Sequence, residues 1–175
     1  AEITYLCDQV MGNKGDFLGV ALGKNLMDGK TTNEIRRISL QIGKEFWKLG
    51  YRGFFDIDFI LSANNTPYII ETNMRRTGGT HVYDVVKTLF GNSWEKNCFV
   101  VSHDNFCYGK SKLSEKQIMD KMKEVTYPIK GEKMGTIISI INKWKPTFGF
   151  IIVSKSNKET MDIYNKIQNI WAIKN

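Results

Sequence analysis

Apolar residues recur along this chain with two different periods, and the alternation between them predicts an α+β fold. The clearest helical pattern covers residues 31–50, where apolar side chains return every three or four positions. Thr32 or Asn33 is the expected N-cap of this helix, and Gly50 is the expected stop. The apolar face of the helix consists of Ile35, Ile38, Ile42, Phe46 and Leu49.

The remaining segments divide into helices and strands by the same criteria. Helices are predicted over residues 82–91, 115–125 and 157–173, and Ser114 is the expected cap of the second. The Gly-rich stretch 11–25 is irregular apart from one short strand. Alternating or β-branched runs predict strands at residues 2–10, 17–21, 53–62, 67–73, 98–102, 134–144 and 148–155.

The order of these elements suggests two units. A boundary near residues 92–97 precedes a helix–strand–strand–helix pattern, so we expect one unit at residues 1–95 and a small α+β unit at residues 96–175. The chain begins without Met, inside a predicted strand, which suggests a piece of a longer protein.

The net charge and its distribution along the chain indicate which kinds of ligand the protein is expected to bind. The 25 Lys and Arg exceed the 18 Asp and Glu, for a formal net charge of +7, but the basic residues are spread along the chain. Nucleic-acid binding calls for a basic stripe with interleaved aromatic residues, so this pattern does not favour it. A positive field suits anionic substrates instead. No segment approaches the ~18 apolar residues of a membrane span, and we expect no membrane association.

The three cysteines, Cys7, Cys98 and Cys107, form no C-x-x-C pair, and their odd number argues against a disulfide framework. A reducing cytoplasm is therefore the expected location. An alternative is a zinc site made of Cys98, His103 and Cys107, although a fourth ligand is missing.

The chemistry concentrates in the predicted hairpin around the turn at residues 63–66. If this hairpin is regular, Asp58 lies opposite Glu71 and Asp56 lies opposite Asn73. Because side chains alternate along strands, these four polar residues share one face. The other face carries Ile57, Phe59, Leu61, Tyr68 and Ile70 and is expected to join a core.

Carboxylates that face each other across strands repel by roughly 0.2–1 kcal/mol per pair. A hard cation offsets this repulsion, and magnesium prefers carboxylate and amide oxygens together with phosphate oxygens. The alternative is a solvated acidic face relieved by Arg52, Arg75 or Arg76. Spacing alone leaves the two interpretations equal.

The segments GYRGFFDIDFI and YIIETNMRRTGGTH together resemble the closing motif of the ATP-grasp superfamily. The resemblance covers roughly residues 1–90 and implies the C-terminal lobe of an ATP-grasp domain, an antiparallel sheet with helices, followed here by a small α+β appendage. The stretch 75–81, expected to be a Gly-containing loop, and the tail after it look most like peptide ligases of the pheganomycin type. Asp56 departs from ligases that carry a basic residue at that position.

The resemblance implies an enzyme that joins a carboxylate to an amine through an acyl phosphate made from ATP. Carried onto this chain, Asp58, Glu71 and Asn73 are the expected ligands for Mg²⁺ bound to ATP. Arg75 is expected to contact the phosphoryl group or the substrate carboxylate, with an ion pair to Asp56 as the alternative. Arg76 is either a second such group or an ordinary surface residue.

Other residues receive weaker roles from the same resemblance. The backbone N–H groups of Gly78 and Gly79 are expected to hold the oxyanion, with an ordinary glycine turn as the alternative. Ile60 and Ile70 match positions that contact adenine, although both also suit a core. His81 is either a substrate contact or a packed or capping residue.

The phosphate-contacting lysines, flexible loop and adenine hinge of the N-terminal ATP-grasp lobe are not recognisable here. Lys14 and Lys24 lie near glycines but lack a strand–loop–strand context. We therefore expect the partner to be an N-terminal lobe of the same protein, and this chain alone to be incomplete and inactive. Two alternatives remain: an acid–thiol ligase on the same fold, and a degenerate, non-catalytic scaffold.

Overall fold

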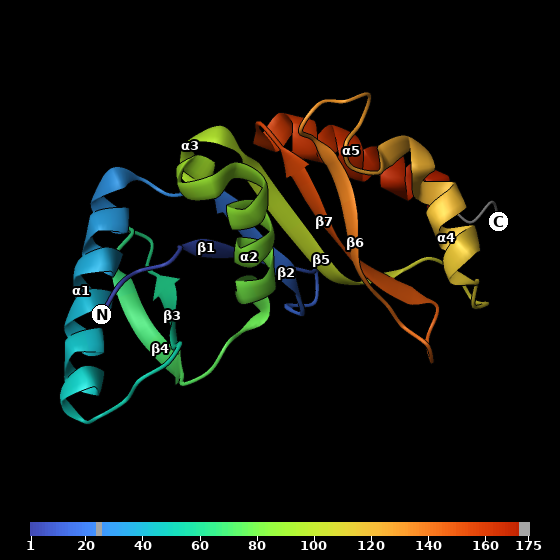
Figure 1. Ribbon diagram of the computed structural model, residues 1–175. Helices are drawn as coiled ribbons and strands as arrows, with labels where there is room; N and C mark the ends of the chain where they lie inside the picture. The colour runs from blue at the N-terminus through green and yellow to red at the C-terminus, as the bar shows by residue number, and fades with distance from the viewer. Residues whose placement is uncertain (24–25, 172–175) are drawn as a thin grey trace.

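A five-stranded antiparallel sheet forms the body of the protein in a computed structural model that describes residues 1–23 and 26–171 (Figure 1). Its strands lie in the order β1-β2-β5-β7-β6. They span Cys7–Met11 (β1), Phe17–Gly23 (β2), Phe99–Cys107 (β5), Gly135–Ile141 (β6) and Thr147–Ser154 (β7). A separate two-stranded sheet, formed by β3 (Asp56–Leu61) and β4 (Pro67–Asn73), is the predicted hairpin.

Helices cover both faces of the large sheet and flank the hairpin, so the protein is α+β with antiparallel sheets, as the sequence predicts (Figure 1). None of the described helices is both long and apolar enough to cross a membrane. The helices are α1 (Gly29–Lys48), α2 (Gly78–Phe90), α3 (Trp94–Asn97), α4 (Glu115–Met122) and α5 (Asn157–Trp171), with 3-10 turns η1 (Gly91–Ser93) and η2 (Lys123–Val125).

Strand β7 is buried on both faces because each face carries its own helical layer. On one face, α2 and α3 pack on alternate residues of β2, β5 and β7. On the other face, α4 and α5 pack on the residues between them. The first core contains Val20, Leu22, Val82, Val86, Trp94, Val100, Ile151 and Val153. The second contains Ile118, Met122, Phe148, Phe150, Ile152, Ile163, Ile167 and Trp171. A strand buried on both sides needs a near-continuous apolar run, which is the sequence of β7.

Helix α1 lies alongside the hairpin at the other end of the molecule (Figure 1). Its predicted apolar stripe is confirmed at Ile35, which is buried, whereas Leu49 at the end of the helix is exposed. Phe46 packs edge-on against Phe55, with ring centroids 5.1 Å apart. The prediction that Thr32 or Asn33 caps α1 is wrong. Asp28 is the cap, and its Oδ1 accepts from the Thr31 backbone N–H at 2.9 Å.

Several boundaries differ from the sequence prediction. Helix α2 begins at Gly78, so the loop predicted through residue 81 is too long. The Thr80 hydroxyl accepts from the Thr77 backbone N–H at 3.1 Å and stabilises this earlier start. Strand β5 extends past the predicted 98–102, while β1 begins only at Cys7.

The other predicted helices and strands are present with small shifts of their bounds. Ser114 caps α4 as predicted, because its hydroxyl accepts from the Gln117 backbone N–H at 3.3 Å. The last positions of the predicted tail helix, 172–173, lie outside the described residues, as does Lys24. Strands from both sides of residue 95 share the large sheet. The division into units 1–95 and 96–175, which stays a prediction, therefore does not follow a break in hydrogen bonding.

Candidate functional site

The register of the hairpin is confirmed where the predicted site lies. Asp56 pairs with Asn73, and Asp58 pairs with Glu71, so the four polar side chains share one face. Beyond Asp58 the register shifts by one residue at a β-bulge, because Phe59 pairs with Ile69. The bulge marks the end of the polar part of the hairpin.

The bulge overturns the prediction of a single apolar core face. Ile70 is the extra residue of the bulged strand, and Tyr68 pairs with Ile60 instead of sharing a face with Phe59 and Leu61. Ile60, Tyr68 and Ile70 are 49%, 57% and 62% exposed. An extra residue reverses the side of every residue beyond it, which spacing within one strand does not reveal. Ile60 and Ile70, predicted to contact adenine, therefore lie on the exposed part of the hairpin.

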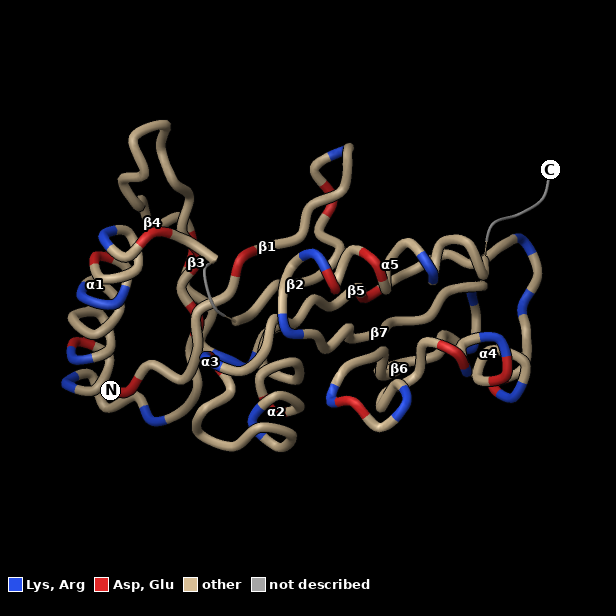
Figure 2. Tube along the Cα trace, turned by 90° about the horizontal axis from the view of Figure 1, so that it is seen from above, with Lys and Arg blue, Asp and Glu red and all other residues tan. Residues whose placement is uncertain are grey.

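Asp58 lies at the centre of a hydrogen-bonded cluster. Its Oδ1 accepts from Gln9 Nε2 at 3.1 Å, and its Oδ2 accepts from Asn73 Nδ2 at 3.2 Å. Asn73 Oδ1 in turn accepts from Arg75 Nη2 at 3.0 Å. The acidic positions of β1, β3 and β4 therefore gather where the hairpin meets the large sheet (Figure 2). Strands β1 and β4 both donate to this one carboxylate of β3, and Arg75 joins the cluster through Asn73.

The cluster shows the electrostatic cost of facing carboxylates. Partial burial and then the negative charge of Glu71 raise the pKa of Asp58 above its usual value, while Gln9 acts against this rise. Burial and the charge of Asp58 likewise raise the pKa of Asp56, and the Thr77 hydroxyl opposes that rise. The nearby thiol of Cys7 has its pKa raised to about 12 by burial and by the same aspartates. A bound cation would offset this repulsion.

A cavity of about 400 Å³ joins the cluster to the N-terminus of α2. It is bounded by the polar face of the hairpin, by β1 and β2, by Ile35 and Ser39 of α1, and by residues 77–79. Gly78 and Gly79 are the first residues of α2, so the N–H groups of this first turn lack partners within the helix. A helix N-terminus with free N–H groups favours anions.

The glycines of α2 differ in what they tolerate. A Cβ added at Gly79 would lie 3.0 Å from the ring of Tyr5, whereas one at Gly78 would meet only ordinary contacts at 3.6 Å or more. Close packing against Tyr5 therefore favours a glycine at position 79. At position 78 a side chain would make ordinary contacts with Phe17 and Asp104.

The two arginines after β4 separate into different roles. Arg75 binds Asn73 and forms no direct ion pair with Asp56 among the described residues, although its charge acts to lower the pKa of the Asp56 carboxyl. Arg76 pairs with Asp84 at 3.0 Å, and its guanidinium lies 4.6 Å from the centroid of the Phe54 ring. Arg76 is thus a structural surface residue of this arrangement.

Two of the side chains in the cluster are not among the residues predicted from sequence. Gln9 binds Asp58 from β1, and Thr77 faces Asp56 from the N-cap of α2. Thr77 carries a local signal, since a Thr before a helical run is a favoured cap. Gln9 carries none, because only the three-dimensional arrangement brings β1 to the hairpin. His81 is exposed in the first turn of α2.

The donor set of the cluster suits a hard cation better than a soft one. The oxygens of Asp58, Glu71 and Asn73 are the type that Mg²⁺ prefers, and they offer two facing carboxylates without a bound lysine or arginine between them among the described residues. The side-chain oxygen of Asn73 now accepts from Arg75, so metal binding requires that contact to break. Asp58 also accepts from the amides of Gln9 and Asn73. Among residues 1–23 and 26–171 no group of three or more Asp, Glu, His and Cys side chains is placed to hold a metal ion. A magnesium site would therefore need these contacts to rearrange as well.

The alternative zinc site is wrong. Within the described part of the chain, no group of three or more His, Cys, Asp and Glu side chains is placed to hold a metal ion. Cys98 is buried in the core, where its thiol contacts the Trp94 carbonyl, and Cys107 is exposed. All three cysteines are free thiols.

Comparison with known proteins adds no family to this site. No protein-family model matches the sequence, and no curated protein matches it.

Proposed function

We propose that this chain provides the magnesium- and phosphate-binding half of an ATP-grasp ligase that joins a carboxylate to an amine. The observation that carries the proposal is the pairing of Asp58 with Glu71 and of Asp56 with Asn73, at a cavity that also includes the N-terminus of α2. A cluster of facing carboxylates costs stability unless a cation binds it. Its position beside the N-terminus of α2 would bring a bound cation and a bound anion together.

In this proposal the acidic side chains would bind the metal ion, and the arginine and the backbone N–H groups would bind anionic groups. Asp58, Glu71 and Asn73 would hold Mg²⁺, which neutralises the ATP phosphates when bound. Arg75, released from Asn73, would reach the phosphoryl group or the substrate carboxylate through its planar guanidinium. The backbone N–H groups of Gly78 and Gly79 would stabilise the oxyanion that forms when an amine attacks the acyl phosphate.

The adenine and the remaining phosphate contacts would come from an N-terminal lobe of the same protein. The exposed apolar surface that includes Ile60, Tyr68 and Ile70 agrees with this, because such a surface is normally covered by a partner or a ligand. The carboxylate and amine, such as amino acids or short peptides, would then bind between the two lobes. We expect this chain alone to bind Mg·ATP weakly or not at all, and a micromolar dissociation constant measured by calorimetry would contradict the half-site.

The decisive experiment measures ADP release by the protein with its N-terminal lobe present. Magnesium, ATP and pools of amino acids or short peptides are supplied. We expect release that requires both a carboxylate and an amine and is lost in Glu71→Gln, which removes one charge and keeps the shape of the side chain. Asp120→Asn, which removes an acidic charge from α4, is the matched control and should keep full activity.

The other outcomes separate the alternatives. Release that requires a thiol in place of the amine would show an acid–thiol ligase on the same fold. Failure of the complete protein to bind Mg·ATP would contradict catalysis and leave a scaffold role. Retention of full activity in Glu71→Gln would show that the paired carboxylates are not the metal site.

A further inference from the structure

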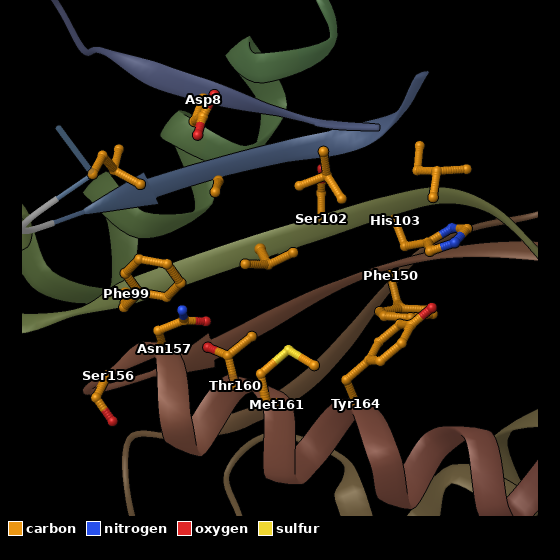
Figure 3. A pocket seen from close by; sticks show the side chains of 15 residues that line it. Asp8, Phe99, Ser102, His103, Phe150, Ser156, Asn157, Thr160, Met161 and Tyr164 are labelled. Carbon is orange, nitrogen blue, oxygen red and sulfur yellow. The ribbon is translucent and has the colours of Figure 1, made fainter. Parts of the chain in front are cut away.

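A second cavity lies between α5 and the large sheet (Figure 3). Helix α5 packs on β7 and β5 but stops short of β2, which leaves a cavity of about 580 Å³. This volume falls within the usual range of small-molecule sites. Asp8 on β1 belongs to the lining of both this cavity and the cavity at the hairpin, so the two are neighbours.

Apolar and aromatic side chains form opposite walls of this cavity. Phe99 and Val101 of β5 line one wall. Met161 and Tyr164 point toward the sheet from α5 (Figure 3). Ala21 on β2 is small, so it leaves the floor between them open. Two walls of this kind form a slot, and ring faces with a thioether sulfur nearby favour a flat aromatic ligand.

One polar group in this lining lacks a partner. His103 is 91% buried, since its exposed fraction is 9%, and its Nδ1 has no hydrogen-bond partner among the described residues. The other buried hydroxyls of the lining are occupied: Ser102 Oγ accepts from the Val20 N–H at 2.9 Å, and Thr160 Oγ1 lies 2.6 Å from Ser154 Oγ. Buried polar groups normally have partners. Nδ1 is itself enclosed by the protein, so a ligand group in the cavity would meet the imidazole at its other nitrogen, Nε2.

The imidazole is held in place by other rings. It stacks on Phe150, with centroids 5.6 Å apart, and lies nearly parallel to Tyr164, with an angle of 16° between the ring planes. The ring is therefore oriented before any ligand binds. An oriented polar group in an apolar slot gives direction to a ligand at little entropic cost.

We propose that the cavity between α5 and strands β2 and β5 binds a small, planar aromatic compound that carries one hydroxyl or similar hydrogen-bonding group for His103. The occupant is a small molecule because the space is bounded on two sides by the sheet and by α5 and has the size of a ligand. The site does not depend on the ligase proposal, because none of the proposed metal ligands lines it.

The test uses 2-naphthol, a flat bicyclic ring with one hydroxyl, and the full chain. Two-dimensional ¹H–¹⁵N NMR should show saturable shifts at the amides of Val101, His103 and Met161, with a dissociation constant on the order of 1 mM or tighter. Val101→Phe fills the slot and should abolish these shifts. Ile140→Phe, the same substitution at an exposed position of β6, should leave them unchanged.

Two further variants keep the test decisive if Val101→Phe fails to fold. Met161→Trp enlarges a half-exposed side chain at the mouth and should weaken binding without disturbing the core. His103→Phe keeps the stacked ring and removes both nitrogens, so 2-naphthol should bind about five-fold more weakly. Absence of shifts in the folded protein, or equal binding by Met161→Trp and the unmodified chain, would overturn the site. Equal binding by His103→Phe would overturn the role of the histidine.

Discussion

Strands β7 and β4 each contain a pair of consecutive isoleucines, but the two pairs differ in how far they are buried. Ile151 and Ile152 of β7 are fully enclosed, whereas Ile69 and Ile70 of β4 are about half exposed. The residues are the same and their surroundings differ. Strand β7 has a neighbouring strand on each side and a helical layer on each face, while β4 pairs with β3 alone.

The large sheet around β7 therefore contributes most to stability, whereas the hairpin of β3 and β4 leaves apolar side chains exposed. An apolar pair in the middle of a covered sheet contributes its full transfer free energy. The same pair on a hairpin with one neighbour contributes little, and an exposed apolar surface of this kind marks a contact for something else. The carboxylate cluster lies in the open part, on the polar half of that hairpin.

The largest expected difference between the two regions is in stability. Ile152→Ala should lower the free energy of unfolding by about 2–5 kcal/mol, because it leaves a cavity in the core. Ile70→Ala should lower it by less than about 1 kcal/mol, since this side chain is largely exposed. Urea denaturation followed by circular dichroism measures both. Similar losses for the two variants would show that the hairpin is covered in solution.

A second difference concerns the two histidines. Burial lowers the pKa of His103 below its usual value, with neighbouring Asp104 acting against this, while His81 is exposed on α2. Below a pH of about 6.5 the unfolded chain binds the proton that the folded protein excludes, so stability falls as the pH falls. We expect a loss of at most about 1.4 kcal/mol between pH 7.5 and 5.5.

One variant identifies the source of that loss. In His103→Phe the contribution should disappear from the difference between the urea midpoints at pH 7.5 and pH 5.5. An unchanged difference in His103→Phe would assign the pH dependence to other groups.

The smallest expected effect has an unusual sign. Glu71→Gln should raise the free energy of unfolding by roughly 0.2–1 kcal/mol in the absence of metal, because it removes repulsion with Asp58. Asp120→Asn on α4 should change it by no more than about 0.5 kcal/mol in either direction. Thermal and urea unfolding without divalent cations measure both. A clear destabilisation by Glu71→Gln would mean that the carboxylate serves the fold.

Local patterns in the sequence predicted the elements and the centre of the candidate site. The facing of Asp58 and Glu71 follows from alternation and from a turn at residues 63–66, both of which are short-range. The bulge after Asp58 does not, because an extra residue in one strand depends on how both strands meet their surroundings. The exposure of Tyr68 and Ile70 follows from that bulge.

Contacts between segments far apart in the sequence could not be predicted from local patterns of residues. Gln9 reaches Asp58 across 49 positions, and β2 pairs with β5 although the hairpin and three helices lie between them in sequence. The cavity at His103 likewise needs β2, β5 and α5 together. Gly78 and Gly79 were expected in a loop, and the Thr77–Thr80 pair shows why they begin a helix.

The separation of the hairpin from the large sheet has a consequence for motion on slow timescales. Strands β3 and β4 share backbone hydrogen bonds only with each other among the described strands, so they can open without breaking the five-stranded sheet. Amide protons of β3 and β4 should therefore exchange with solvent much faster than those of β7. A cation or phosphate bound between Asp58 and α2 would tie the hairpin to the rest of the protein and slow that exchange. The hydrogen-exchange rate of the hairpin amides would therefore report whether a ligand is bound between Asp58 and α2.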